Sequence, residues 1–284
     1  MAVSGEQSPH SCSPFFEIMR SFDKIIIHFF LVMALALLSA APAGAQFTDG
    51  GTGLLQMPTA EMQADGTFMV TTNFLNKHSL PKSGWNYNTL QYGICISFWE
   101  RIEIGYICTI FNGAWDPRSD KSYRQTIMRN QDRHLSAKVL FLNEGDFGIE
   151  WMPAVALGVC DIDKGMFRNR SNGYFTRFYA VASKSFRTKW GGIVGHLGYQ
   201  YSFRADFPMN APCAGVSWQP KWLQNKGILD HVNVIAEFDS RTVNLGFITS
   251  IWDNRFEAMF ELQNFQWVNF GLRYKLRLKR IITK

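Results

Sequence analysis

The sequence predicts an all-β protein that forms a single transmembrane antiparallel β-barrel of about 12 strands. Three observations lead to this prediction: apolar and polar residues alternate along most of the chain, the alternating segments are about 10 residues long, and long and short connections follow one another. Aromatic residues make up 15% of the 284 residues, which argues against disorder. After residue 45 no stretch has the roughly 18 consecutive apolar residues of a membrane helix.

The first 45 residues have the pattern of a cleaved secretory signal peptide. Basic residues precede an apolar run over 25–40, and an Ala-Gly-Ala cleavage site follows at 43–45. An uncleaved anchor helix is the alternative. A signal of more ordinary length begins at Met19, so we expect translation to start there. Export predicts an outer-membrane location and lipid or lipopolysaccharide, rather than nucleic acid, as the partner of a chain with net charge +6.

Twelve strands are expected where the two-residue period appears. Their length of about 10 residues exceeds the 5–6 residues of most soluble sandwich strands and suits a tilted membrane strand. The longer connections between them are expected on the outside of the cell and the shorter ones in the periplasm. The expected strands are 67–76, 88–98, 102–111, 133–142, 149–160, 173–186, 191–203, 211–219, 231–239, 242–251, 255–263 and 266–278.

The second and third expected strands form a hairpin around a turn at 99–101. This turn pairs Tyr92 with Cys108 on an apolar face and Cys95 with Gly105 on the other face. Cysteines on opposite faces cannot form a disulfide with each other. All four cysteines that follow the signal are therefore expected to be free small hydrophobic residues.

The last four strands share one apolar face and one polar face. Turns at 240–241, 253–254 and 265 bring Phe247 opposite Phe260 and Glu257 opposite Arg273. A membrane barrel turns the apolar face to lipid and the polar face to the lumen, whereas a soluble sheet needs a second layer. The expected lumenal residues are Asn233, Glu237, Asn244, Ser250, Arg255, Glu257, Glu261, Asn269, Arg273 and Lys275.

The last strand carries a pattern of a polar residue, a glycine, an aromatic residue and a hydrophobic residue. It consists of Asn269, Gly271, Tyr274 and Leu276. This pattern resembles the signal by which outer-membrane proteins are recognised by the barrel-insertion machinery, which is therefore an expected partner. The usual form ends the chain on an aromatic residue, whereas here residues 277–284 follow.

Residues 46–66 form a glycine-rich extended lead-in to the barrel, which is expected over 67–284. Glycines permit positive φ angles or close backbone approach, and Pro58 prevents a helix from running through Met57. The GK[ST] ending of a phosphate loop is absent. We expect the lead-in either to enter the lumen or to pack at the periplasmic rim, as a plug, as a docking segment or simply as a closure of the barrel.

The lead-in and one later hairpin resemble a known family. The order Gly-Leu-x-x-Met-Pro-Thr-Ala, followed by Asp-Gly, is similar to the opening of the YjbH-like family, and Ala236–Asp239 with Asn244–Gly246 resembles its later strand pair. The resemblance implies an outer-membrane barrel for exopolysaccharide production or export, with export proteins as partners, in a single-barrel version. The matching lead-in residues are Gly50, Gly51, Gly53, Leu54, Met57, Pro58, Thr59, Ala60 and Gly66.

The sequence contains no recognisable catalytic, cofactor or metal motif. The histidines have no ligand spacing such as HExxH, and GxSxG is absent. We therefore expect a protein that is not an enzyme. The alternatives are an outer-membrane hydrolase or acyltransferase with a rim site, which would need a nucleophile near His196 or His231, and a secreted soluble glycan-binding β-protein.

Aromatic and basic residues occur together in the expected loop 112–132. Aromatic rings stack on sugars and guanidinium groups bind acidic groups, so this loop is a candidate glycan contact. The residues concerned are Trp115, Arg118, Tyr123 and Arg124.

Overall fold

The computed structural model describes residues 46–82, 84–110, 131–161, 173–202 and 210–278. The chain falls into two compact units, Met1–Leu38 and Ser39–Lys284, and all described residues belong to the second. The expected signal peptide and the candidate glycan residues Trp115, Arg118, Tyr123 and Arg124 lie outside the described residues.

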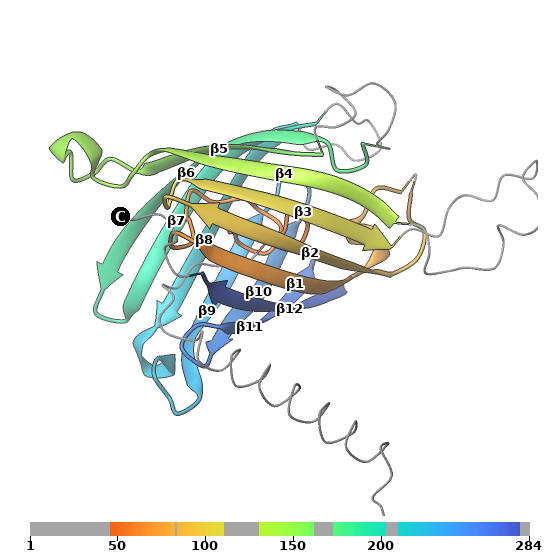
Figure 1. Cartoon of the computed structure of the whole chain (residues 1–284). Helices are drawn as coiled ribbons and strands as arrows, with labels where there is room; N and C mark the ends of the chain where they lie inside the picture. Colours follow the sequence, from red (N-terminus) through yellow and green to blue (C-terminus); the bar gives the residue numbers. More distant parts are fainter. Residues whose placement is uncertain (1–45, 83, 111–130, 162–172, 203–209, 279–284) are drawn as a thin grey trace, which may run out of the picture. The chain divides into compact units, whose positions relative to one another are not determined.

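Twelve antiparallel strands form a closed barrel (Figure 1). Each strand pairs with its neighbours in sequence, and β1 pairs with β12 to close the sheet. The prediction of an all-β, twelve-stranded antiparallel barrel is confirmed. The strands are β1 (Thr67–Leu75), β2 (Thr89–Phe98), β3 (Ile102–Ile110), β4 (Gln131–Leu142), β5 (Ala154–Cys160), β6 (Arg177–Thr188), β7 (Gly191–Tyr201), β8 (Ala211–Pro220), β9 (Leu229–Phe238), β10 (Val243–Ile251), β11 (Phe256–Gln263) and β12 (Trp267–Arg277).

The pairing register agrees with the prediction in the β2–β3 hairpin and across β9 to β12. Tyr92 pairs with Cys108, and Cys95 pairs with Gly105 on the opposite face. Glu257 pairs with Arg273. All four described cysteines are free, as expected.

Two expected strands begin several residues later than predicted. The strand expected from residue 149 begins only at Ala154, because η3 (Asp146–Gly148) and a left-handed Phe147 continue the turn after β4. The strand expected from residue 173 begins at Arg177, after a turn at 174–175. The predicted turn at 240–241 between β9 and β10 is present, because the Asp239 N–H donates to the Thr242 carbonyl at 3.1 Å. The Asp239 carboxylate accepts the N–H groups of Arg241 and Thr242 at 2.9 and 2.7 Å, which stabilises this turn and the predicted register.

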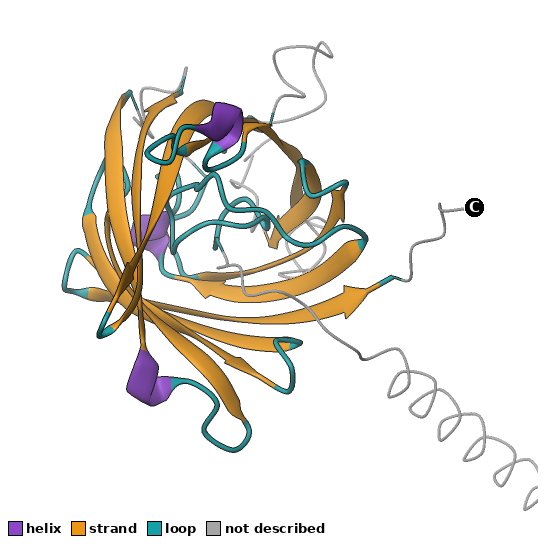
Figure 2. Cartoon of the chain, turned by 90° about the vertical axis from the view of Figure 1, so that its left-hand side faces the viewer, coloured by secondary structure: helices purple, strands orange, loops and turns teal. Residues whose placement is uncertain are grey.

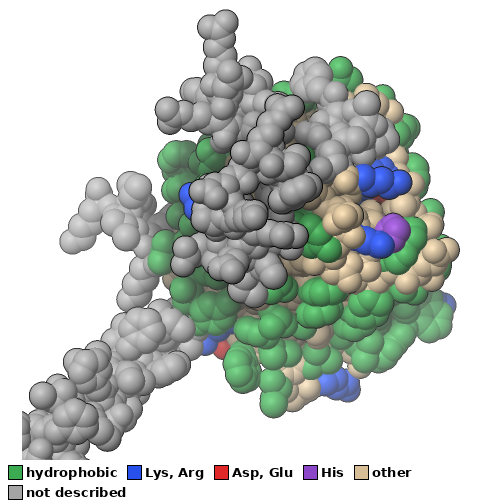
Figure 3. Space-filling view, turned by 90° about the vertical axis from the view of Figure 1, so that its right-hand side faces the viewer, with side chains coloured by type: hydrophobic (Ala, Val, Ile, Leu, Met, Phe, Trp, Pro, Cys, Tyr) green, Lys and Arg blue, Asp and Glu red, His purple; other side chains and the backbone are tan. Residues whose placement is uncertain are grey.

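The outer face of the barrel is apolar. Hydrophobic side chains cover the part of its lateral surface that is visible below the grey atoms in Figure 3. Alternation along each strand sends these residues outward and the polar residues inward. Outward residues that are at least 36% exposed include Val70, Tyr92, Ile94, Ile104, Tyr106, Leu157, Leu197, Phe247, Phe260, Phe270 and Leu272.

The interior of the barrel is occupied by its own chain. Viewed from the end that bears the short turns, the lead-in lies within the ring of strands (Figure 2). Most of its residues are buried. Among the described residues, no helix is long and apolar enough to cross a membrane.

Candidate functional site in the barrel lumen

The lead-in forms a compact set of turns rather than an extended strand. The N–H of Phe47 donates to the Leu55 carbonyl at 2.8 Å, and Gly53 forms an isolated bridge with Pro58. Gly50 has a φ of +67°, a conformation that favours glycine. A Cβ atom at Gly53 would lie 2.9 Å from the Met57 carbonyl oxygen. These glycines therefore allow the tight fold that the lumen can accommodate.

Glu237 of β9 is the principal anchor of this segment. Its carboxylate accepts three successive backbone N–H groups, from Leu55 at 3.0 Å, Gln56 at 2.7 Å and Met57 at 3.2 Å. The Asn244 amide donates to the same carboxylate at 3.0 Å. One buried side chain thus satisfies the turn that would otherwise leave three donors unpaired in the lumen.

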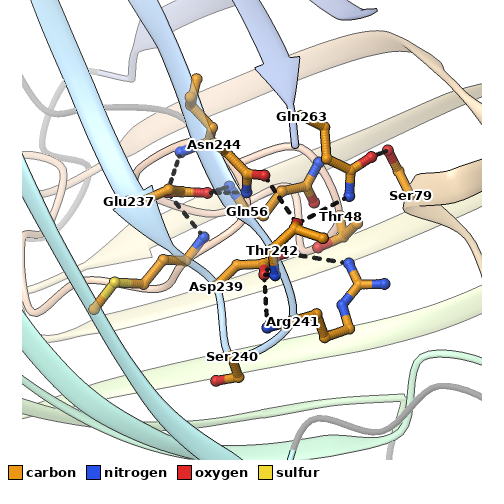
Figure 4. A network of polar contacts seen from close by, with 12 residues as sticks. Thr48, Gln56, Ser79, Glu237, Asp239, Ser240, Arg241, Thr242, Asn244 and Gln263 are labelled. Atoms are coloured by element: carbon orange, nitrogen blue, oxygen red, sulfur yellow. Dashed lines mark hydrogen bonds and ion pairs between the residues drawn. The ribbon is translucent and has the colours of Figure 1, made fainter. Parts of the chain in front are cut away.

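A chain of side-chain hydrogen bonds extends from this anchor toward β11 (Figure 4). The Thr242 hydroxyl donates to Asn244 at 2.9 Å, the Gln263 amide donates to Thr242 at 3.5 Å, and the Ser79 hydroxyl donates to Gln263 at 2.6 Å. Gln56 adds a second link between the lead-in and the wall, because its amide donates to Glu261 at 2.8 Å. The orientation of Glu237 is therefore held by three strands.

A second anchor is the buried pair of Glu103 on β3 and Lys138 on β4, whose charged atoms are 3.2 Å apart. Glu103 accepts the N–H and the hydroxyl of Thr52 at 2.9 and 2.5 Å, and the N–H of Gln63 at 2.9 Å. Lys138 donates to the carbonyls of Thr52 and Glu61 at 2.8 and 2.7 Å. Burial raises the pKa of the Glu61 carboxyl to about 6, an effect that the Lys138 ammonium opposes.

Two arginines complete the polar contacts with the lead-in. Arg177 of β6 forms an ion pair with Asp49 and donates to the Thr48 hydroxyl at 3.2 Å. Arg273 of β12 donates to the Gly51 carbonyl at 3.0 Å. The contacts with the lead-in therefore come from strands on opposite parts of the barrel.

The expected pair of Glu257 and Arg273 is present in the lumen. The nearest charged atoms of the two side chains are 3.8 Å apart. Lys275 forms a shorter ion pair with the same carboxylate. All three side chains are at most 1% exposed, so the Glu257 carboxylate is shared by two buried basic groups.

Apolar residues of the lead-in share one buried cluster with aromatic residues of the long-loop end. Phe47, Leu54 and Leu55 belong to one buried cluster with Trp85 and Phe175. The Trp85 indole donates to the Ile110 carbonyl at 2.9 Å, and its ring centroid lies 5.5 Å from that of Phe175. The lead-in thus supports an aromatic cap over the lumen.

A comparison with protein families assigns the chain as a whole. The model of the YjbH family, described as exopolysaccharide biosynthesis protein YbjH, matches residues 46–279. The chain belongs to the YjbH family. The match begins at the lead-in and continues through the last strand, so the family sequence pattern includes both the lumenal segment and the wall. No curated protein matches the chain.

Most of the lead-in residues that resemble the YjbH family lie inside the barrel. The exception is Gly66, which is partly exposed and has a φ of +69° where β1 begins. Its N–H donates to the Ser97 carbonyl, and its carbonyl accepts the N–H of Leu278. The other resembling residues, Gly50, Gly51, Gly53, Leu54, Met57, Pro58, Thr59 and Ala60, are buried or, for Gly51, nearly so.

The residues of the expected assembly signal lie on both faces of β12. Asn269 and Gly271 face inward, whereas Tyr274 and Leu276 belong to the outward set. The Asn269 amide donates to Glu261 and to Ser79, both at 2.7 Å. In the YjbH family barrel Asn269 is therefore part of the lumenal network, whereas a Cβ atom at Gly271 would lie 3.1 Å from the Phe47 ring of the lead-in.

Sequence analysis did not predict the contacts of three charged residues inside this YjbH family barrel. Asp49, Lys138 and Arg177 were not named, although Lys138 and Arg177 occupy inward positions of their strands. A charge at an inward position of an alternating strand was the available signal. Their common partner, the lead-in, could not be deduced from strand periodicity.

A serine does lie beside His196. Ser183 Oγ and His196 Nδ1 are 2.8 Å apart, and both residues are buried. The same hydroxyl oxygen accepts the N–H of Ala60 at 2.9 Å. Among the described residues, His196 Nε2 has no hydrogen-bond partner, and no cluster of three potential metal ligands is found. The pair therefore lacks the acidic residue that orients the histidine of a catalytic triad.

Proposed function

We propose that this YjbH family member is an outer-membrane β-barrel protein that takes part in exopolysaccharide production or export without catalysing a reaction itself. The family description supports the involvement in exopolysaccharide production. The apolar outer face supports a membrane location, because a barrel in water would expose this surface at a large hydrophobic cost.

A ring of exposed tryptophans is the main observation that supports a membrane location. Each of the five connections at one end of the barrel, which follow β2, β4, β6, β8 and β10, contains one tryptophan that is between 53% and 73% exposed. Alternate turns of an up-and-down barrel lie at the same end, so the five rings encircle one rim. Tryptophan prefers the boundary between acyl chains and water. The residues are Trp99, Trp151, Trp190, Trp222 and Trp252.

This arrangement suggests the orientation and the partners. The three longest connections, 76–88, 111–130 and 161–176, lie at the opposite end. Long loops of outer-membrane barrels face outward, so the tryptophan rim would lie at the inner leaflet and the long loops would face lipopolysaccharide. We propose the barrel-insertion machinery as the partner during assembly and polysaccharide export proteins as partners in the mature envelope.

Fractionation combined with gel migration tests the membrane proposal. We expect the folded protein in outer membranes, with a shift in migration on a denaturing gel between unboiled and boiled samples. Recovery in the aqueous periplasmic fraction, with no shift on boiling, would instead support the secreted soluble glycan-binding alternative. Loss of exopolysaccharide on gene deletion, restored by the full chain, tests the cellular role.

The Ser183–His196 contact keeps a hydrolase or acyltransferase as the second candidate. Its geometry allows the hydroxyl to donate to the imidazole, as in nucleophilic catalysis. We expect Ser183→Ala and His196→Ala to support normal exopolysaccharide output, because the hydroxyl is occupied by the Ala60 N–H and covered by the lead-in. Loss of output in both variants, with folded barrels in the membrane, would favour the enzyme.

A further inference from the structure

We infer that residues 46–66 seal a latent, cation-preferring channel through this barrel. The inference rests on the proposed membrane location, since a channel needs a membrane to cross. The wall is complete by itself, because the pairing of β1 with β12 closes a ring of twelve antiparallel pairings. The lead-in supplies none of these pairings, and its own isolated bridge, Gly53 with Pro58, is internal. The wall can therefore remain closed when the segment is absent.

The second step is the completeness of the seal. Phe47, Leu54, Leu55 and Met57 are each at most 1% exposed. A cavity between the lead-in and the wall, next to Thr52, has a volume of about 10 Å³. This volume is enough for about one water molecule, so the lead-in packs closely against the wall there.

The third step is that the seal is held without covalent bonds. The described cysteines are free, and the lead-in is attached through hydrogen bonds and ion pairs to wall side chains. Polar wall groups, chiefly Glu103, Glu237 and Arg177, could bond with water if the segment left. Without the lead-in, the polar lumen could therefore fill with water, unlike an apolar core.

The charge of the uncovered wall indicates what would pass. Among the described residues, Glu237 and Glu261 form no ion pair, and both accept hydrogen bonds from Gln56 of the lead-in. They lie on β9 and β11 on either side of β10, so withdrawal of Gln56 leaves two carboxylates facing the same space. Glu103 keeps Lys138, Glu257 is shared by Arg273 and Lys275, and the departure of Asp49 releases Arg177. Among the described residues outside the lead-in, seven buried acidic side chains still outnumber four buried basic ones. Acidic groups that line a pore favour cations.

The native cysteines allow the access of water to the lumen to be measured, and no cysteine has to be introduced. Cys95, Cys160 and Cys213 face inward and are at most 1% exposed. Cys95 lines the small cavity next to Thr52, and Cys213 belongs to the same buried cluster as Phe47. Cys108 faces outward on β3 and is the internal control.

The first experiment measures labelling of the full chain in detergent by a water-soluble maleimide. Two variants loosen the seal: the full chain without residues 47–59, and the double variant Glu103→Gln with Glu237→Gln. We expect at least tenfold faster labelling of the three inward cysteines in the variants, with Cys108 unchanged, as located by mass spectrometry. Equal labelling in the wild type and in either folded variant would overturn the inference. A shift in migration on boiling identifies the variants that have folded.

The second experiment measures ion conduction in planar bilayers. We expect the full chain to be silent and the variant without 47–59 to show discrete conductance steps with a preference for potassium over chloride. Adding Glu237→Gln and Glu261→Gln to that variant should reduce this preference. A conducting wild type, or a folded and inserted variant that is silent, would overturn the inference. Failure of every form to insert, with cysteine protection intact in detergent, would count against the membrane proposal instead.

Discussion

At the residue scale, Glu237 accepts three backbone N–H groups of the lead-in. We expect Glu237→Ala to lower the free energy of unfolding by about 1–3 kcal/mol, because the buried N–H groups of Leu55, Gln56 and Met57 lose their acceptor. Urea unfolding in detergent micelles measures this change. Glu100→Ala, which removes an exposed carboxylate in a short turn, is the control and should have little effect. Equal stability of both variants would mean that the anchor contributes nothing.

A second prediction at the residue scale concerns the inward glycines, where a larger side chain should destabilise the barrel. A Cβ atom at Gly246 would lie 2.0 Å from the Phe260 carbonyl oxygen and 2.9 Å from Leu55 Cδ1, so Gly246→Ala must displace the wall. We expect a loss of about 1–3 kcal/mol in the same unfolding assay. Gly192→Ala is a matched control, because no atom lies within 4 Å of its Cβ position. A loss in the control as large as in Gly246→Ala would contradict the steric explanation.

At the scale of elements, the sheet has one short pairing. β8 and β9 share five paired residues, from Ala214–Phe238 to Trp218–Val234, whereas β6 and β7 share eleven. We expect backbone amides along the β8–β9 pairing to exchange hydrogen with solvent faster than those between β6 and β7, since local opening costs less where fewer bonds must break. Hydrogen exchange followed by mass spectrometry tests this order. Faster exchange between β6 and β7 would contradict it.

Strands and register could be predicted because they depend on local alternation. The pairing of Glu257 with Arg273 followed from matching apolar residues across short turns. The late start of β5 could not be predicted, because a left-handed Phe147 is unusual for a bulky residue. The contacts of Asp49 and Glu237 with their partners join residues that are far apart in sequence, and no periodicity encodes such contacts.

At the scale of the whole molecule, the two faces of the wall have separate roles. The outer face is apolar and the inner face is polar, so the same alternation that suits a membrane also provides the groups that hold the lead-in. The lead-in and the wall are therefore interdependent: the polar lumen needs partners for its buried groups, and the lead-in supplies them.

The tryptophan rim leads to a prediction about the depth of the whole barrel in a membrane. If the five exposed rings of this rim lie at the lipid–water boundary, lipids brominated near the headgroup should quench tryptophan fluorescence more than lipids brominated near the chain end. We expect this order for the full chain in vesicles, and we expect it to weaken when Trp99, Trp151 and Trp190 are replaced by phenylalanine. Replacement of the buried Trp85 in the aromatic cap should leave the order unchanged and serves as the control. Stronger quenching from the chain end would mean that the rim lies within the acyl chains and not at the boundary.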